Sequence, residues 1–235
     1  MKNALVPLVS GHFYHIYNRG NNRENLFYRK ENYIYFLVKY DAYLNDYLDT
    51  YAFCLLPNHF HLLVKVKDLS ALEISKGDFS SDGDENDNVR KKDLPGLRYP
   101  GESDAIPPRD GIAFTDSTIS QQFRKFFISY AQAINKQQNR IGSLFQKNFK
   151  RIRVDNKKYL TNLIYYIHAN PQIHGLIDDF RNWPYSSYPK MLIAKKSHLK
   201  KEEVLELFGS LEEFKIYHAA VQDLKRIRGL LLEEE

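Results

Sequence analysis

Two histidines one residue apart, His59 and His61, are the residues whose types and spacing most directly suggest chemistry. Their surroundings, Leu56–Leu63, otherwise have the character of a β-strand. Side chains at positions i and i+2 of a strand leave the same face, about 6 to 7 Å apart, so both imidazoles could bind one divalent metal ion. Phe60 between them is expected to point into a core. Taken alone, the pattern is equally compatible with two ordinary polar positions on a half-buried strand.

A second pair with chemical potential, Tyr166 and Asn170, lies just before Pro171. Residues four apart share one helix face at about 5 to 6 Å, so a metal ligand could lie beside a phenol nucleophile. A phenol is only about one part in a thousand ionised at neutral pH and would need help, for example from a divalent ion that polarises a phosphate. The alternative is a core tyrosine and an asparagine at a helix end. Tyr165 lies about 100° around the helix, and we interpret it as a packing residue.

The charge of the chain is unevenly distributed. Residues 70–117 carry eleven acidic and six basic residues, whereas the rest of the chain holds 28 basic and 18 acidic residues, a net charge of +10. A basic cluster of one sign favours a phosphate backbone as partner over an ordinary solvated surface. Residues 120–158 contain one acid, Asp155, and ten basic residues: Arg124, Lys125, Lys136, Arg140, Lys147, Lys150, Arg151, Arg153, Lys157 and Lys158.

Composition restricts the class of protein. The length of 235 residues and a 43% hydrophobic content predict a globular protein with one main domain, placed at about residues 1–190, and a helical extension over 191–235. We expect no membrane partner, because no apolar run of about 18 residues and no signal peptide occur. The single cysteine, Cys54, cannot form an intramolecular disulfide, which favours a cytoplasmic location.

The hydrophobic periodicity predicts the order of the elements that position these residues. Strands are expected at 12–17, 50–56, 59–66 and 145–154, and helices at 30–47, 119–138 and from about 157 to 169 or 170, with short helices in 201–228. The turn at Pro57-Asn58 predicts a hairpin. The order is that of an α+β, ferredoxin-like βαββαβ fold, whose central strands would form an open platform.

The segment 68–117 interrupts this pattern with Gly, Ser, Asp, Asn and Pro. We interpret it as a polar insertion, mobile or partly disordered, and a plain surface loop is the simplest reading. A second hypothesis places it near the basic surface expected to bind a phosphate backbone, where its acidic residues would weaken binding to incorrect nucleic acids. Deleting it would then change the affinity for nucleic acid.

Four stretches together resemble one family. The run Leu56-Pro57-Asn58-His59-Phe60-His61-Leu62-Leu63 resembles the HUH motif of single-tyrosine insertion-sequence transposases. Three others look like landmarks of the branch called REP-associated tyrosine transposases, and the likeness runs from about residue 10 to about residue 190, apart from the insertion. These stretches are Gly142-Ser143-Leu144-Phe145-Gln146-Lys147-Asn148-Phe149-Lys150, Tyr166-Ile167-His168-Ala169-Asn170-Pro171 and Trp183-Pro184-Tyr185-Ser186-Ser187-Tyr188.

The resemblance implies a transposase, or a domesticated descendant, that cleaves and rejoins single-stranded DNA near a hairpin. His59, His61 and Asn170 would hold Mg²⁺ or Mn²⁺, and Tyr166 would form a 5′-phosphotyrosine link without ATP. Many relatives have glutamine or another polar ligand at the position of Asn170, so this amide could bind the metal or mainly position Tyr166. Either a monomer or a homodimer is compatible. The residues expected to contact DNA are Arg19, Arg23, Arg124, Lys147, Lys150, Arg151 and Arg153.

Two other functions remain open from the sequence. A noncatalytic nucleic-acid-binding module or regulator on the same fold would need none of the four site residues. A metal phosphoesterase with water as nucleophile would form no covalent adduct with DNA, and the excess of basic residues argues against it.

Overall fold

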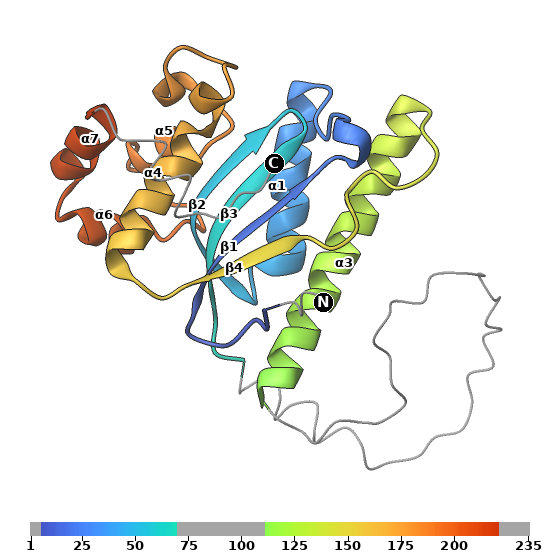
Figure 1. The fold of residues 1–235 in the computed structure, drawn as a ribbon, viewed down its shortest axis with the longest axis horizontal. Helices are drawn as coiled ribbons and strands as arrows, with labels where there is room; N and C mark the ends of the chain where they lie inside the picture. Colours follow the sequence, from blue (N-terminus) through green and yellow to red (C-terminus); the bar gives the residue numbers. More distant parts are fainter. Residues whose placement is uncertain (1–5, 70–110, 221–235) are drawn as a thin grey trace.

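The computed structural model describes residues 6–69 and 111–220 (Figure 1). Four strands form one antiparallel sheet in the order β2-β3-β1-β4. The chain runs through β1 (Phe13–Arg19), α1 (Lys30–Leu44), β2 (Leu48–Leu56), β3 (His59–Val66), α3 (Gly111–Gln138), β4 (Lys150–Val154) and α4 (Lys157–Ile173). This order and topology confirm the predicted α+β, ferredoxin-like arrangement. The insertion predicted over 68–117 lies mostly outside the described residues.

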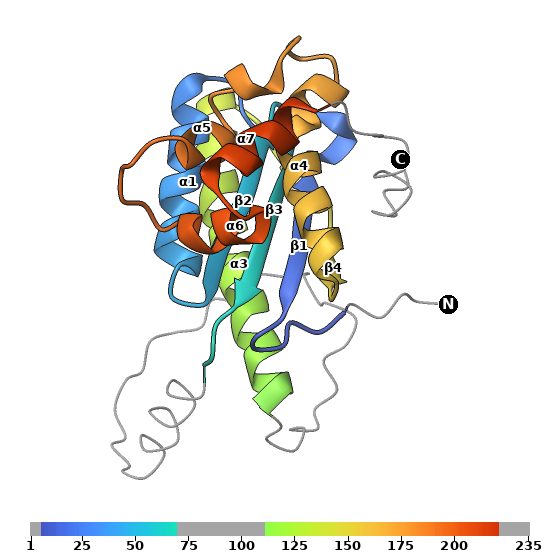
Figure 2. The same ribbon diagram turned by 90° about the vertical axis from the view of Figure 1, so that its left-hand side faces the viewer.

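Helices α1 and α3 pack side by side on one face of the sheet (Figures 1 and 2). The alternation of β3 turns Phe60, Leu62 and Val64 toward this layer. Phe60 of β3 is fully buried there, with its ring centroid 5.0 Å from that of Phe36 on α1. Phe126 of α3 completes the contact at 4.9 Å from Phe36. An aromatic core on this side therefore fixes which face of β3 is left for the two histidines.

The opposite face of the sheet is partly covered by α4, which contacts β2 and β3 (Figure 2). The expectation of an open platform is therefore wrong for this half of the sheet. The cause is the apolar side of α4, where Leu163, Ile164 and Ile167 are fully buried. Beyond α4 lie α6 (Lys201–Phe208) and α7 (Leu211–Ala219), the described part of the predicted helical extension.

Several boundaries differ from prediction. Helix α3 begins at Gly111 rather than 119, so the polar segment ends earlier than expected. The hydrophobic periodicity missed the first turns of α3 because two of the residues buried there, Thr115 and Thr118, are polar. Strand β4 begins at Lys150 rather than 145. Helix α1 ends at Leu44 rather than 47, and β2 begins two residues early at Leu48. Helix α4 continues past Pro171 to Ile173, because a proline in the last turn removes only one backbone donor.

The outer edge of β2 is paired with the segment 183–187. The Trp183 indole donates to the Leu55 carbonyl at 3.0 Å, the Leu55 amide donates to the Tyr185 carbonyl at 2.9 Å, and the Ser187 amide donates to the Phe53 carbonyl at 2.8 Å. Unpaired strand edges invite association, and this segment satisfies the edge from within the chain. The short elements η1 (Asn21–Arg23), η2 (Phe180–Asn182) and α5 (Tyr188–Met191) complete the fold.

Two remaining sequence inferences concern Cys54 and the membrane. Cys54 is buried on β2, and burial raises the pKa of its thiol. Within the described residues, no helix has the length and apolar character needed to cross a membrane.

Candidate active site

The two histidines of β3 leave the same face of the strand, as predicted. Their ring centroids lie 5.2 Å apart, with an angle of 88° between the ring planes. Phe60 points to the opposite face and is fully buried. His61 is buried, whereas His59, at the start of the strand beside the hairpin turn, is partly exposed. The pair is therefore open to solvent on the His59 side.

Hydrogen bonds to the Nδ1 atoms decide how each ring could bind a metal. His59 Nδ1 donates to the Asn58 side-chain oxygen at 2.6 Å, which leaves Nε2 with the lone pair. His61 Nδ1 lies 3.0 Å from His15 Nε2, so a metal could reach His61 only through Nε2. Both rings could thus present Nε2 to the same ion.

The site histidines are neutral at physiological pH. Burial lowers the pKa of His59 to about 3, with smaller contributions from His174 and Arg19. Burial, together with His15 and His59, holds the pKa of His61 well below its usual value. Burial also lowers the pKa of His15 to about 3. Neutral imidazole is the form that binds a metal ion, so the electrostatics of the site suit metal binding.

Helix α4 brings Tyr166 and Asn170 over the same face of the sheet. The Tyr166 ring meets His61 and His15 edge-on, at centroid distances of 5.9 and 6.5 Å. Both α4 side chains are fully buried. The four predicted site residues, far apart in the sequence, therefore lie next to one another. Tyr165 packs on Phe180 at 5.7 Å, on the other side of the helix, as predicted.

Asn170 carries a buried oxygen with no hydrogen-bond partner. Its amide nitrogen donates to the Tyr166 carbonyl at 3.2 Å, but Oδ1 is unsatisfied. The side chain lies close enough to His59 to raise its pKa slightly, although Oδ1 and the ring nitrogens fall short of hydrogen-bond geometry. An unsatisfied buried oxygen is costly unless a ligand completes it.

These donors fit a divalent ion of intermediate hardness. Two imidazole nitrogens and one amide oxygen favour Mn²⁺ or another transition ion over Mg²⁺, which prefers oxygen ligands. Across the described parts of the chain, no group of three or more His, Cys, Asp and Glu side chains could hold a metal. Asn170 is thus the residue that would raise the two-histidine set to three protein ligands.

Two histidines at the site were not predicted. His15 of β1 is fully buried beside His61, and His174 at the end of α4 has its ring centroid 4.9 Å from that of His59. His174 follows Asn170 by four residues, so helix periodicity could have revealed it. His15 could not have been found this way, because its proximity depends on the pairing of β1 with β3, in which His61 faces Tyr17.

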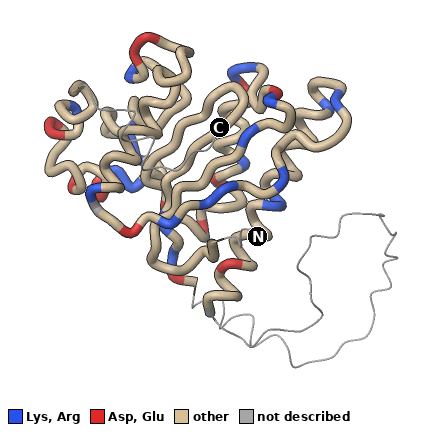
Figure 3. Tube along the Cα trace, viewed as in Figure 1, with Lys and Arg blue, Asp and Glu red and all other residues tan. Residues whose placement is uncertain are grey.

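The predicted DNA-contacting residues divide into two groups. Arg19 faces His59 across β1 and β3, and the segment 144–146 docks against residues 18–21, which brings Lys147 toward the Arg19–Arg23 turn. Arg23, Lys147 and Lys150 are exposed. Figure 3 shows Lys and Arg along β4 and around this turn. Arg124 is exposed on α3, the helix that covers the other face of the sheet.

Arg151 and Arg153 are already paired within the protein. Arg151 is buried and donates to Asp116 at 2.7 Å and to the Ser120 hydroxyl at 3.2 Å. Arg153 is exposed and donates to Asp155 at 2.7 Å. The expectation that β4 turns apolar residues to the core and basic residues to phosphates is wrong for Arg151, because this side chain turns toward α3 and is paired there with Asp116.

Comparison with known proteins gave one sequence relative and one structure. No family model matches the chain. The chain is 24% identical over 147 residues to a Haemophilus influenzae protein named "Putative REP-associated tyrosine transposase". The match covers 63% of this chain and 62% of the relative, so the chain spans less than two thirds of that protein. The family name is the one that the four sequence stretches predicted, and the resemblance is confirmed.

The solved structure is described as a REP-associated tyrosine transposase bound to a REP hairpin. It superposes with a TM-score of 0.48 at 15% identity, over 82% of this chain and 86% of that one.

Proposed function

We propose that this protein cleaves and rejoins single-stranded DNA near hairpins, with Tyr166 as nucleophile and a divalent ion held by His59, His61 and Asn170. The observation that carries the proposal is the convergence of these four residues on one face of the sheet. The unsatisfied Asn170 oxygen and the neutral imidazoles support an ion at this position. The name of the sequence relative supports the same reaction class.

In the proposed reaction the Tyr166 phenol oxygen attacks phosphorus and forms a new O–P bond. The bond to the 3′-oxygen breaks, and the phenol proton passes to solvent as the leaving oxygen gains one. The products are a 5′-phosphotyrosine link and a free 3′-hydroxyl, which can reverse the step and join strands. When bound, the ion would neutralise charge on the phosphate. The link retains the phosphodiester energy, so no ATP is needed.

Substrate binding would use the partly or fully exposed basic residues near the histidines. Arg19 lies next to His59, and Arg23, Lys147 and Lys150 extend the positive surface. Such residues position a phosphate backbone without reading sequence. We therefore expect hairpin affinity to fall steeply with salt.

One observation favours a second candidate, a noncatalytic DNA-binding module. The Tyr166 side chain is fully buried. A phosphodiester can reach its hydroxyl only after the side chain or α4 moves. In a binding module this movement would not be required.

The test is to incubate the protein with labelled single-stranded hairpin oligonucleotides and Mn²⁺, and to look for an adduct that resists denaturation. We expect the adduct peptide to contain Tyr166, and the adduct to be lost in Tyr166→Phe and in His59→Ala. Tyr165→Phe is the matched control, because this neighbour packs away from the site. Salt-sensitive binding without any adduct across a broad hairpin library would favour the binding module.

A further inference from the structure

A buried chain of hydrogen bonds joins α7, α4 and β2 behind the candidate active site. His218 Nδ1 lies 2.8 Å from the Phe214 carbonyl oxygen, and His218 Nε2 lies 2.9 Å from His168 Nδ1. His168 Nε2 lies 2.7 Å from the Ser187 hydroxyl, which in turn accepts from the Phe53 amide at 2.9 Å. His168 and Ser187 are fully buried and His218 is 2% exposed.

Burial keeps both imidazoles neutral, and with neutral rings the two ends of this hydrogen-bond chain allow a single arrangement of protons. The Phe214 carbonyl can only accept, so His218 Nδ1 carries a proton and Nε2 accepts. His168 Nδ1 therefore donates to His218, and His168 Nε2 accepts from the Ser187 hydroxyl. The Ser187 hydroxyl also lies 3.3 Å from the Phe53 carbonyl oxygen, but a hydroxyl that donated there would leave His168 Nε2 without a donor. Both neutral imidazoles thus carry their proton on Nδ1.

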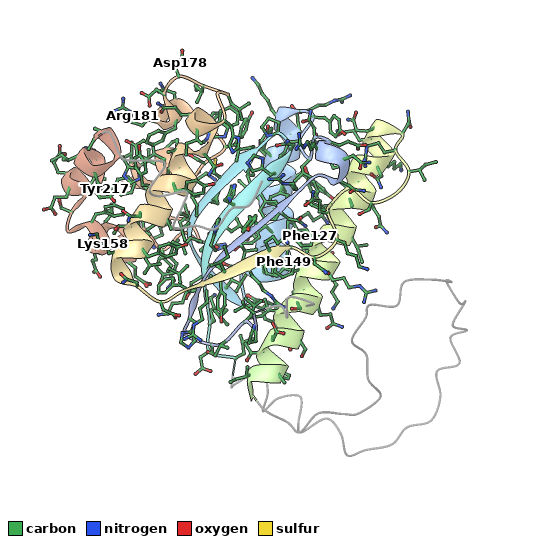
Figure 4. The ribbon with its side chains drawn as sticks, viewed as in Figure 1. Phe127, Phe149, Lys158, Asp178, Arg181 and Tyr217 are labelled. Carbon is green, nitrogen blue, oxygen red and sulfur yellow. The ribbon has the colours of Figure 1, made fainter. Side chains whose placement is uncertain are left out.

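The hydrogen-bond chain holds α4 on the side of the helix that faces away from the candidate active site. His168 is two residues from both Tyr166 and Asn170, so it points about 200° away from them around the helix. Tyr166 meets His61 and His15 on the sheet, while His168 is held by α7 and by Ser187. Tyr217 of α7, labelled in Figure 4, adds a bond from its hydroxyl to the Asn162 oxygen of α4 at 2.5 Å. A rotation of α4 would break these contacts.

Ser187, His168 and His218 have the order of a nucleophile, a base and an orienting residue, but a hydrolytic role does not fit. The Ser187 oxygen is fully buried and accepts a hydrogen bond from the Phe53 amide of β2. A substrate would have to displace the segment 183–187 from the edge of β2. The hydrogen-bond chain is therefore suited to holding α7, α4 and β2 together.

We propose that α7 is a positioning element for the tyrosine helix, and that His218 and His168 are positioning residues that set the rotation of α4 and hence the direction of Tyr166 and Asn170. This inference rests on the proposed function. Neither histidine would contact DNA or metal. A small misplacement of a reacting group can reduce a rate about a hundredfold, so the contact of α7 would be visible in the chemical step.

The first test compares His218→Phe with His218→Gln in the full-length protein. Phenylalanine removes the acceptor for His168, whereas the glutamine oxygen can replace it. We expect His218→Phe to slow adduct formation in single turnover at least about tenfold, with hairpin affinity within about twofold of wild type. His218→Gln should recover most of the rate. Ile216→Ala, at a position on α7 that is 61% exposed, is the control.

The second test needs no variant of the chain. Long-range ¹H–¹⁵N correlation spectra of the metal-free wild-type protein distinguish the two histidine tautomers, and we expect Nδ1–H for both His168 and His218. Either residue with its proton on Nε2 would overturn the inference even if His218→Phe does not fold.

The outcomes separate this inference from the proposed function. No adduct with wild type would refute the proposed reaction, and with it the positioning role for that reaction. An adduct that forms in folded His218→Phe at the wild-type rate would refute only the positioning role. Equal losses of rate in His218→Phe and His218→Gln would also refute it, because the hydrogen bond to His168 would then have no part.

Discussion

At the scale of single residues, the site is defined by polar atoms whose hydrogen-bond partners are missing. Of the three unsatisfied buried side-chain atoms in the described residues, His15 Nδ1 and Asn170 Oδ1 lie at the candidate active site. Buried polar groups in proteins are normally paired. The position of two exceptions in one place supports the ligand site that we propose.

Replacing Asn170 should therefore separate stability from metal binding. We expect Asn170→Leu to leave the free energy of unfolding within about 1 kcal/mol of wild type, because no partner of Oδ1 is lost. The same change should reduce Mn²⁺ affinity at least about tenfold. Urea denaturation and titration calorimetry measure the two effects. A large loss of stability with unchanged affinity would show that Asn170 is structural.

Arg151 was expected to contact DNA, but its contacts in the structure are those of a residue that stabilises the fold. Its side chain is 5% exposed and pairs with Asp116, and its guanidinium lies 5.4 Å from the Phe149 ring centroid. We expect Arg151→Leu to lower the free energy of unfolding by about 2 to 4 kcal/mol, because Asp116 loses its cation. Hairpin affinity of the folded fraction should remain close to wild type. Exposed Lys150→Ala should instead weaken hairpin binding without loss of stability.

At the scale of elements, the turn of the hairpin that carries His59 is held by the segment that follows β1. The Gly20 amide donates to the Asn58 carbonyl at 2.7 Å, and the Leu26 and Phe27 amides donate to the Pro57 carbonyl at 2.7 and 3.0 Å. These bonds join the turn after β1 to the turn before β3. Arg19 and His59 are placed together by the same contacts.

Gly20 is the position where this arrangement tolerates least change. An added Cβ would lie 1.9 Å from the Glu24 carbonyl oxygen, so the backbone would have to move. We expect Gly20→Ala to lower the free energy of unfolding by about 2 kcal/mol or more and to reduce Mn²⁺ affinity through displacement of His59. Asn21→Ala, at an exposed neighbouring position, is the control. Unchanged melting temperature in Gly20→Ala would contradict this packing.

At the scale of the whole molecule, buried neutral histidines connect folding to pH. Burial lowers the pKa of His218 to about 4 and holds that of His168 well below its usual value. Both residues lie where α7 meets α4. The docking of the C-terminal helices should therefore respond to acid before the sheet does.

The sign of the pH effect follows from proton binding. Above about pH 6.5 these histidines are neutral in both the folded and the unfolded state, so they do not reduce the free energy of unfolding. Between pH 6.5 and about 4 the unfolded chain binds protons that folded His218 does not, so stability falls as the pH falls. We expect a loss of about 2 kcal/mol for His218 between pH 7 and pH 5, measured by urea denaturation. His218→Gln should lose less over the same range, and an equal loss would contradict the assignment.

The local patterns of the sequence predicted the order of the elements, the shared face of His59 and His61, and the one-turn spacing of Tyr166 and Asn170. These features follow from periods of two and 3.6 residues, which are properties of short segments. The predicted boundaries were wrong where polar residues interrupted the hydrophobic periodicity, as at the start of α3. They were also wrong at Pro171, which lies in the last turn of α4, where a helix tolerates proline.

Only the tertiary structure decided which partners these residues meet. His15 and His61 are 46 residues apart, His168 and His218 are 50 apart, and Arg151 and Asp116 are 35 apart. Each contact depends on strand register or on which side of one helix packs against another, and no local period encodes either. The residues of the candidate site could therefore be proposed from the sequence, while the position of His15 behind His61 and that of α7 behind the tyrosine helix required the fold.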